Sequence, residues 1–160
     1  MGKTTVIRAV ASALPRRQVH GFYSEEIRRN GERVGFRAVT FDGRKVTMAR
    51  VGLPGPRVGK YGVDVAAIEE LAASALALRR GGGIYLIDEI GKMECLAPRF
   101  VAAVRVILDS TVPVVATVGL RGGGFIAEVK RRRDAELWEV TPANRDAAPD
   151  RVLEWMTARG

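Results

Sequence analysis

The sequence predicts an α/β layered domain with a mainly parallel sheet, into which an antiparallel ribbon is inserted early. Three observations support this fold class. Short apolar runs typical of strands alternate with helical patterns along the chain. The run "IYLIDEIGKME" from residue 84 is continuously apolar up to two acids, as in a parallel strand buried on both faces. At 34–48, apolar and polar residues alternate on both sides of Asp42-Gly43, a strong hairpin signal.

The first half of the chain supplies the opening helix and the ribbon. At 3–14, apolar residues recur at helical spacing until Pro15 ends the run. A strand is expected at the start of "VHGFYSEEIRR" (19–29), before the hairpin. The segment 51–64 is rich in Gly and Pro and is expected to be a loop.

The second half supplies the rest of the layered domain. A helix is expected at 64–80, with Asp64 as its N-cap and the Gly81–Gly83 run at its end. The apolar run at 112–119 predicts a second buried strand. The other expected elements are helices at 97–109, 125–133 and 146–158 and a strand at 135–141.

Length and composition predict one domain covering 1–160. Hydrophobic residues make up 47% of the chain, enough for a core. No apolar run approaches the ~20 residues that a membrane helix needs, and charged residues interrupt the apolar start, so neither an anchor nor a secretory leader is expected. The single Cys95 suits a reducing compartment, and the cytoplasm is the expected location.

The net charge of +8 favours polyanionic partners such as nucleotides or nucleic acid. The basic residues are spread in pairs, with one tetrad at 130–133, and aromatic residues are not interleaved with them. A stacking platform for bases is therefore not indicated, and nucleic acid is not the favoured partner. An Arg of the tetrad could neutralise transition-state charge, although a solvated helix face is the favoured interpretation.

The opening "MGKTT" contains the end of a phosphate-binding loop. In the pattern G-x-x-x-x-G-K-[ST], backbone amides cradle the phosphates, the Lys reaches the β- and γ-phosphates, and the hydroxyl ligates Mg²⁺. Gly2, Lys3 and Thr4 match the last three positions, and Thr5 would lie near the α-phosphate. The helix that follows presents its positive end to the same anion. The tetrapeptide "GKTT" alone is weak evidence for a phosphate-binding loop. The evidence is stronger because a helix follows directly and an acidic motif appears downstream.

That second motif is the acidic end of the strand from residue 84. Asp88 would lie at the carboxyl edge of the sheet, where it can orient the Mg²⁺ shell. Glu89 is placed to polarise an attacking water as a general base. Together with Lys3 and Thr4, these acids predict a magnesium–triphosphate site.

The motifs resemble one family. The segments "GKTT", "GFYSEEIR", "GFRAVTFDG", "VGKYGVD", "DEIGKME" and "LWEVTPANRD" occur in this order in the thermophile-type, or cancer-related, nucleoside-triphosphatases. The resemblance runs from residue 2 to about 155. It implies a three-layer, RecA-like P-loop NTPase fold, with "GKT" as the Walker A remnant and "DE" as Walker B. It also implies Mg²⁺-dependent hydrolysis of ATP, GTP and other nucleoside triphosphates to the diphosphate and phosphate.

The chain departs from that family at its front, where members have a strand and a "G-x-P-G-V-G-K-T" loop. Met1 stands where that Val belongs, and GTG encodes Val and also serves as a start codon. We therefore expect the natural protein to start about a dozen residues upstream of Met1. This number is the sum of one strand of ~5–6 residues, the missing part of the loop and an initiating Met. Upstream DNA without these features would contradict this. For the 160-residue chain we expect weak nucleotide affinity and slow turnover. Comparable turnover by this chain and by a chain extended with the strand and loop would contradict that expectation.

Other residues have two open interpretations. Glu25 and Glu26 are either acids near the metal or water, or turn charges that pair with Arg28 or Arg29. Asn144 and Arg145 follow the last expected strand, at the edge where ligands of open α/β sheets bind, and could contact base or ribose. Alternatively, residues 141–144 only form a turn into the last helix. Lys60, in its Gly-rich loop, could reach phosphate or base.

Two other functions remain open from the sequence. A P-loop kinase would transfer the phosphoryl group to a nucleoside or metabolite, with 51–64 helping to bind the acceptor. A nucleotide- or RNA-binding module without turnover would use the Arg-rich surface instead. Phosphate release without an acceptor favours hydrolysis, and steeply salt-sensitive RNA binding favours the module.

Overall fold

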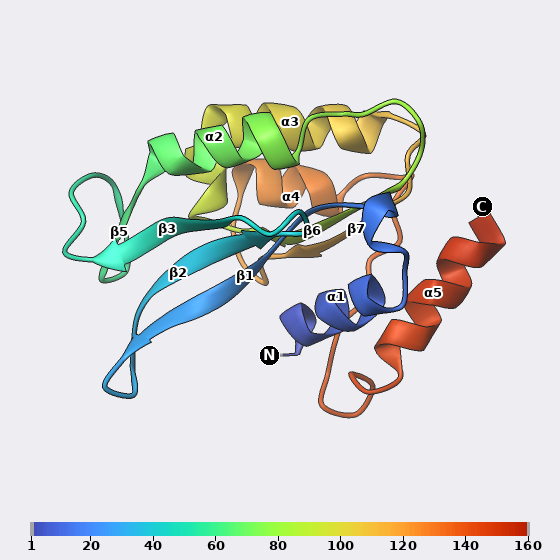
Figure 1. Ribbon diagram of the computed structural model, residues 1–160, viewed down its shortest axis with the longest axis horizontal. Helices are drawn as coiled ribbons and strands as arrows, with labels where there is room; N and C mark the ends of the chain where they lie inside the picture. The colour runs from blue at the N-terminus through green and yellow to red at the C-terminus, as the bar shows by residue number, and fades with distance from the viewer. Residues whose placement is uncertain (1, 160) are drawn as a thin grey trace.

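The computed structural model describes residues 2–159. Met1, and with it the prediction of an upstream start, lies outside the described residues. One seven-stranded sheet has the order β4-β5-β3-β2-β1-β6-β7 (Figure 1). β1, β6 and β7 are parallel, and the remaining pairings are antiparallel. The strands are β1 Val19–Arg29, β2 Glu32–Thr40, β3 Lys45–Val51, β4 Arg57–Val58, β5 Tyr61–Val63, β6 Ile84–Ile90 and β7 Val114–Val118.

Helices cover both faces of the sheet, which confirms the three-layer α/β class (Figure 1). One face carries α2 (Val65–Ala75), α3 (Pro98–Asp109) and α4 (Gly124–Lys130). The other face carries α1 (Lys3–Ser12) and α5 (Ala148–Arg159), which pack on each other. Among the described residues, none of the helices combines the length and the apolar character needed to span a bilayer.

The side chains of β6 explain its continuous apolar sequence. Tyr85 and Ile87 belong to the core under α2 and α3, whereas Ile84 and Leu86 belong to the core under α1 and α5. All four are at most 4% exposed. A strand that is buried on both faces has no solvent-facing side, so its residues do not alternate between apolar and polar. The two acids of β6 come near its carboxyl end, at the edge of the sheet.

β1 passes from the parallel part of the sheet into the antiparallel ribbon. Its first four residues pair with β6, and from Phe22 onward it pairs with β2. Gly21 has φ +104°, and a Cβ there would lie 2.0 Å from the Leu86 carbonyl oxygen, so only glycine permits this approach. The crossover brings the middle of β1, including Ser24, beside the carboxyl end of β6.

The antiparallel ribbon is larger than the single hairpin expected. The β2–β3 hairpin around Asp42-Gly43 is confirmed, but 51–64 is not only loop, because β4 and β5 extend the ribbon beyond β3. The following helix begins at its Asp64 N-cap, which accepts a hydrogen bond from Ala67 N at 3.0 Å. It ends at Ala75 rather than near 80, since the hydroxyl of Tyr85 bonds the backbone of the segment after it.

The strand expected at 135–141 is absent, and that prediction is wrong. Within the described residues this segment pairs with no strand, and the edge strand β7 pairs with β6 alone. Its apolar residues Trp138 and Val140 still pack on the α1–α5 core, and Arg151 lies over the Trp138 ring at 4.7 Å. An alternating pattern predicts which side chains are buried, but a strand also needs a backbone partner.

Candidate functional site

The amino end of α1 meets the carboxyl end of β6, so the two motifs converge. Lys3 Nζ lies 2.8 Å from Glu89 Oε2, and Thr4 Oγ1 donates to Asp88 Oδ2 at 2.7 Å. These residues are 84 to 86 positions apart in the chain. The folded chain therefore brings the expected phosphate-binding, metal-binding and catalytic residues into one cluster.

Asp88 is the most constrained member of the cluster, at 2% exposure. Besides Thr4, its Oδ2 accepts from the amide and hydroxyl of Ser24 on β1, at 3.1 and 3.2 Å. Its Oδ1 accepts from the hydroxyl of Thr117 on β7 at 2.6 Å. These hydrogen bonds from three side chains and one amide hold the buried carboxyl group of Asp88 in one orientation.

The Thr4 hydroxyl and the Asp88 carboxylate suit a magnesium ion. Both are hard oxygen donors, and Mg²⁺ usually takes only one or two protein ligands of this kind, with phosphates and water completing its shell. Among residues 2–159 there is no group of three His, Cys, Asp or Glu side chains that would hold a metal by itself. The Thr4 and Asp88 oxygens fit the small number of protein ligands that Mg²⁺ takes when phosphates and water complete its shell.

Lys3 and Glu89 form an accessible ion pair, with one third of each side chain exposed. Lys3 also donates to the Val118 carbonyl at the end of β7, at 3.0 Å. A partly exposed pair of this type contributes little to stability, so its partners can exchange when an anion arrives. Lys3 thus pairs with Glu89, the residue that is expected to act as the base.

The backbone at the start of α1 is shaped for an anion. Gly2 has φ +93°, a conformation that suits glycine. The first amides of an α-helix lack partners within the helix, and here Val6 N donates to Gly2 O at 3.0 Å. Thr5 is exposed in this first turn. The amides at the start of a helix and the helix dipole favour anions, as expected for this end of α1.

The segment after residue 141 contains Asn144 and Arg145, and only Arg145 lies near the start of α1 in the contacts of the described residues. A Cβ built on Gly2 would lie 3.3 Å from Arg145 Cδ, so Arg145 lies over the start of α1. Asn144 holds its own loop, since its Oδ1 accepts from Thr141 N at 2.8 Å and its Nδ2 donates to Glu139 O at 2.9 Å. Arg145 thus lies beside the expected phosphate-binding end, and its contact with a ligand stays a prediction, whereas Asn144 forms the turn.

The other candidates contact residues of the ribbon. Glu25 pairs with Arg37 and lies 3.9 Å from Lys45, and Glu26 pairs with Arg28. Lys60 lies over the ring of its neighbour Tyr61. No contact among the described residues joins these side chains to Asp88. In the basic tetrad, Arg132 is held by Asp109 and Asp134, which supports the structural interpretation.

Three polar residues at the site were missed from the sequence. Ser24 and Thr117 complete the shell of Asp88, but a lone hydroxyl residue in a strand carries no motif. Glu94 lies in the quoted "DEIGKME" yet had no assigned role. It is 6% exposed, and burial, with lesser contributions from Glu89 and Asp88, raises its pKa to about 8.

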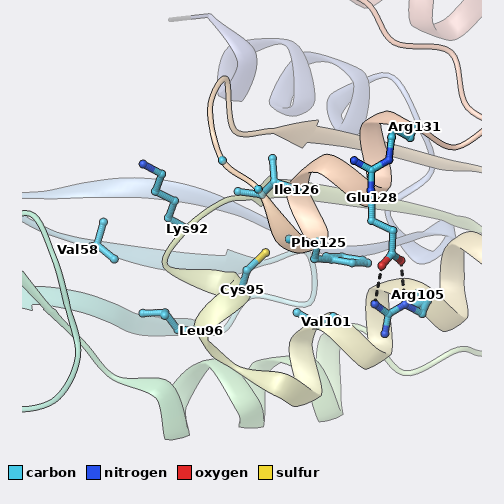
Figure 2. Close-up of a pocket in the computed structure, with 13 residues that line it drawn as sticks. Val58, Lys92, Cys95, Leu96, Val101, Arg105, Phe125, Ile126, Glu128 and Arg131 are labelled. Carbon is cyan, nitrogen blue, oxygen red and sulfur yellow. Dashed lines mark hydrogen bonds and ion pairs between the residues drawn. The ribbon is translucent and has the colours of Figure 1, made fainter.

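A separate cavity of about 780 Å³ lies between α3 and α4 (Figure 2). Its wall includes the Arg105–Glu128 ion pair at 2.9 Å and the Cys95 thiol. Burial raises the pKa of this thiol to about 11, so it is not a nucleophile near neutral pH. The cavity is lined by none of Lys3, Asp88 and Glu89.

Comparisons with known proteins give a consistent result. The family model described as NTPase matches residues 1–153. "Nucleoside-triphosphatase THEP1" of Thermotoga sp. (strain RQ2) is 38% identical over 155 residues, 96% of this chain and 88% of that protein. The human "cancer-related nucleoside-triphosphatase" is 36% identical over 163 residues, covering 91% and 86%. The crystal structure of THEP1 from Aquifex aeolicus superposes with a TM-score of 0.86 at 36% identity, over 96% of this chain and 92% of that one.

Proposed function

This chain belongs to the NTPase family, and from that premise we propose that it hydrolyses ATP, GTP and other nucleoside triphosphates to the diphosphate and phosphate. The observation that carries the proposal is the meeting of Lys3 and Thr4 with Asp88 and Glu89 at the carboxyl edge of the sheet. This is the arrangement that phosphoryl transfer requires, since it depends on positioning and charge stabilisation more than on covalent chemistry.

The triphosphate is bound by the start of α1. Lys3 supplies a positive charge, and the amides at Gly2 to Thr5 donate to phosphate oxygens. Arg145, which lies over Gly2, adds a second cation at the same end of the helix. Mg²⁺, held by Thr4 and Asp88, would neutralise charge on the phosphates.

Glu89 directs the attacking water. In the ligand-free site its Oε2 is bonded to Lys3. Phosphate binding draws the Lys3 ammonium toward the anion, which leaves the carboxylate free to accept a proton from water. The single free thiol, Cys95, suits a reducing compartment, and we propose that the protein works in the cytoplasm.

The direct test is phosphate release from ATP and GTP with Mg²⁺ and no added acceptor. We expect turnover under these conditions and its loss when EDTA removes the cation. Release only when a nucleoside or metabolite acceptor is added would indicate a kinase. RNA binding that ignores nucleotide, without any phosphate release, would indicate a binding module.

Replacing Arg145 with Ala is expected to raise the KM for ATP about tenfold, because a charge-assisted hydrogen bond to phosphate contributes about 1.5 kcal/mol or more. The exposed Arg80, on the segment after α2, provides a charge-matched control, and Arg80→Ala should leave KM unchanged. Steady-state kinetics on both variants measures the effect. An unchanged KM in Arg145→Ala would remove Arg145 from the phosphate site.

A further inference from the structure

Glu94 is a buried acid that the hydrolysis scheme does not yet use. It begins the 3-10 turn Glu94–Leu96, which follows β6 after a short turn, and is 6% exposed. No ion pair among the described residues includes it. Burying a carboxyl group without a cation is costly, and an apolar side chain at such a position usually gives a more stable protein.

The carboxyl groups of Glu94 and Glu89 both approach Gly91. A Cβ built on Gly91 would lie 2.7 Å from Glu89 Oε1 and 2.9 Å from Glu94 Oε1. Both oxygens therefore border the same small space above the glycine. The other oxygen of Glu89, Oε2, is the one bonded to Lys3. Lys3 is thus bonded to one oxygen of the Glu89 carboxylate, and Glu94 borders the same space as the other.

Glu94 is uncharged near neutral pH. Burial is the main cause that raises its pKa to about 8, and the charges of Glu89 and Asp88 act in the same direction. The backbone amides of Glu94 and Gly91 oppose this shift without cancelling it. A neutral carboxyl group can stay beside the ionised Glu89 without repelling it, and its O–H is a hydrogen-bond donor.

We propose that Glu94 is a positioning residue that holds the carboxylate of Glu89 toward the attacking water. The inference deepens the proposed hydrolysis and rests on it. Phosphate binding removes Lys3 from Glu89, and without a second contact the long Glu89 side chain would regain its rotamers. Glu94 borders the space beside Oε1, the Glu89 oxygen that Lys3 does not bond, so it can keep the base oriented after Lys3 has left.

The test compares Glu94→Gln with Glu94→Leu. Gln keeps a neutral polar group with a donor, and Leu fills the buried space without one. We expect Glu94→Gln to keep kcat within about threefold of the wild type and Glu94→Leu to lose about tenfold to a hundredfold, with KM for ATP little changed in both. Glu70→Gln, on the exposed face of α2, is the control.

A merely structural role predicts a different result, because Leu then serves as well as Gln. Wild-type kcat in Glu94→Leu would overturn the proposal, and so would an equal loss in Glu94→Gln and Glu94→Leu. Thermal unfolding of each variant shows whether it is folded. Failure of the proposed function is distinguishable, because the wild type would then release no phosphate from any nucleoside triphosphate.

Discussion

Replacing Glu89 with Gln is expected to lower kcat by two to four orders of magnitude, the contribution of about 10²–10⁴ that a general base makes. The amide cannot accept a proton from water, but it has nearly the same shape. Lys3 and the start of α1 remain in place, so the KM for ATP should change little. A loss of kcat with unchanged KM indicates a group that acts in the transition state rather than in binding.

Single-turnover phosphate release, with nucleotide affinity measured separately, distinguishes this result from a loss of binding. Glu154→Gln, an exposed glutamate on α5, is the matched control and should behave as the wild type. The ion pair with Lys3 is partly exposed, so unfolding of the Glu89 variant should be nearly unaffected. If Glu89→Gln turned over at the wild-type rate, the water would be activated by another group.

The second large effect is on stability, at Glu94. In the folded protein its pKa is about 8, whereas its ordinary value is 4.5. Between these values the native state holds a proton that the unfolded chain releases, so the native state binds more protons and rising pH destabilises it. The stabilisation is fully present below pH 4.5 and is lost as pH rises to about 8. The full change is on the order of 5 kcal/mol.

Glu94→Gln removes this dependence because the amide does not titrate. Urea unfolding without nucleotide or Mg²⁺, at pH 5, 6.5 and 8, should show the variant gaining stability over the wild type as pH increases. Glu70→Gln should follow the wild type at every pH, since Glu70 is exposed. A constant difference between Glu94→Gln and the wild type across this range would show that Glu94 is ionised in the folded state at pH 5.

If the pH dependence is observed, Glu94 lowers the stability of the folded protein at the expected active site as the pH rises. Near pH 8 the wild type retains a buried acid that an amide would replace with a gain in stability. Such a residue is expected where function requires it, because proteins accept locally unfavourable groups at active sites. The kinetic comparison of Gln with Leu at position 94 then shows which property of the acid is used.

The sequence by itself determined the order and type of most elements. β6, α1, α3 and the β2–β3 hairpin follow from apolar periodicity and turn residues, which act over a few positions. It also identified Lys3, Thr4, Asp88 and Glu89, because a phosphate loop and an acid-ended strand are each local patterns. Their pairing in space was expected because a phosphate loop and an acid-ended strand together form one magnesium–triphosphate site.

Only the tertiary structure decided the features that depend on distant neighbours. Ser24 and Thr117 reach Asp88 from strands 64 and 29 positions away, and no local pattern indicates such a contact. Glu94 becomes a neutral buried acid only after the fold removes its water and places Glu89 beside it. The segment 135–141 has a strand-like pattern but lacks a pairing partner. Periodicity specifies which faces are buried, whereas hydrogen-bond partners and protonation states depend on which segments the folded chain brings together.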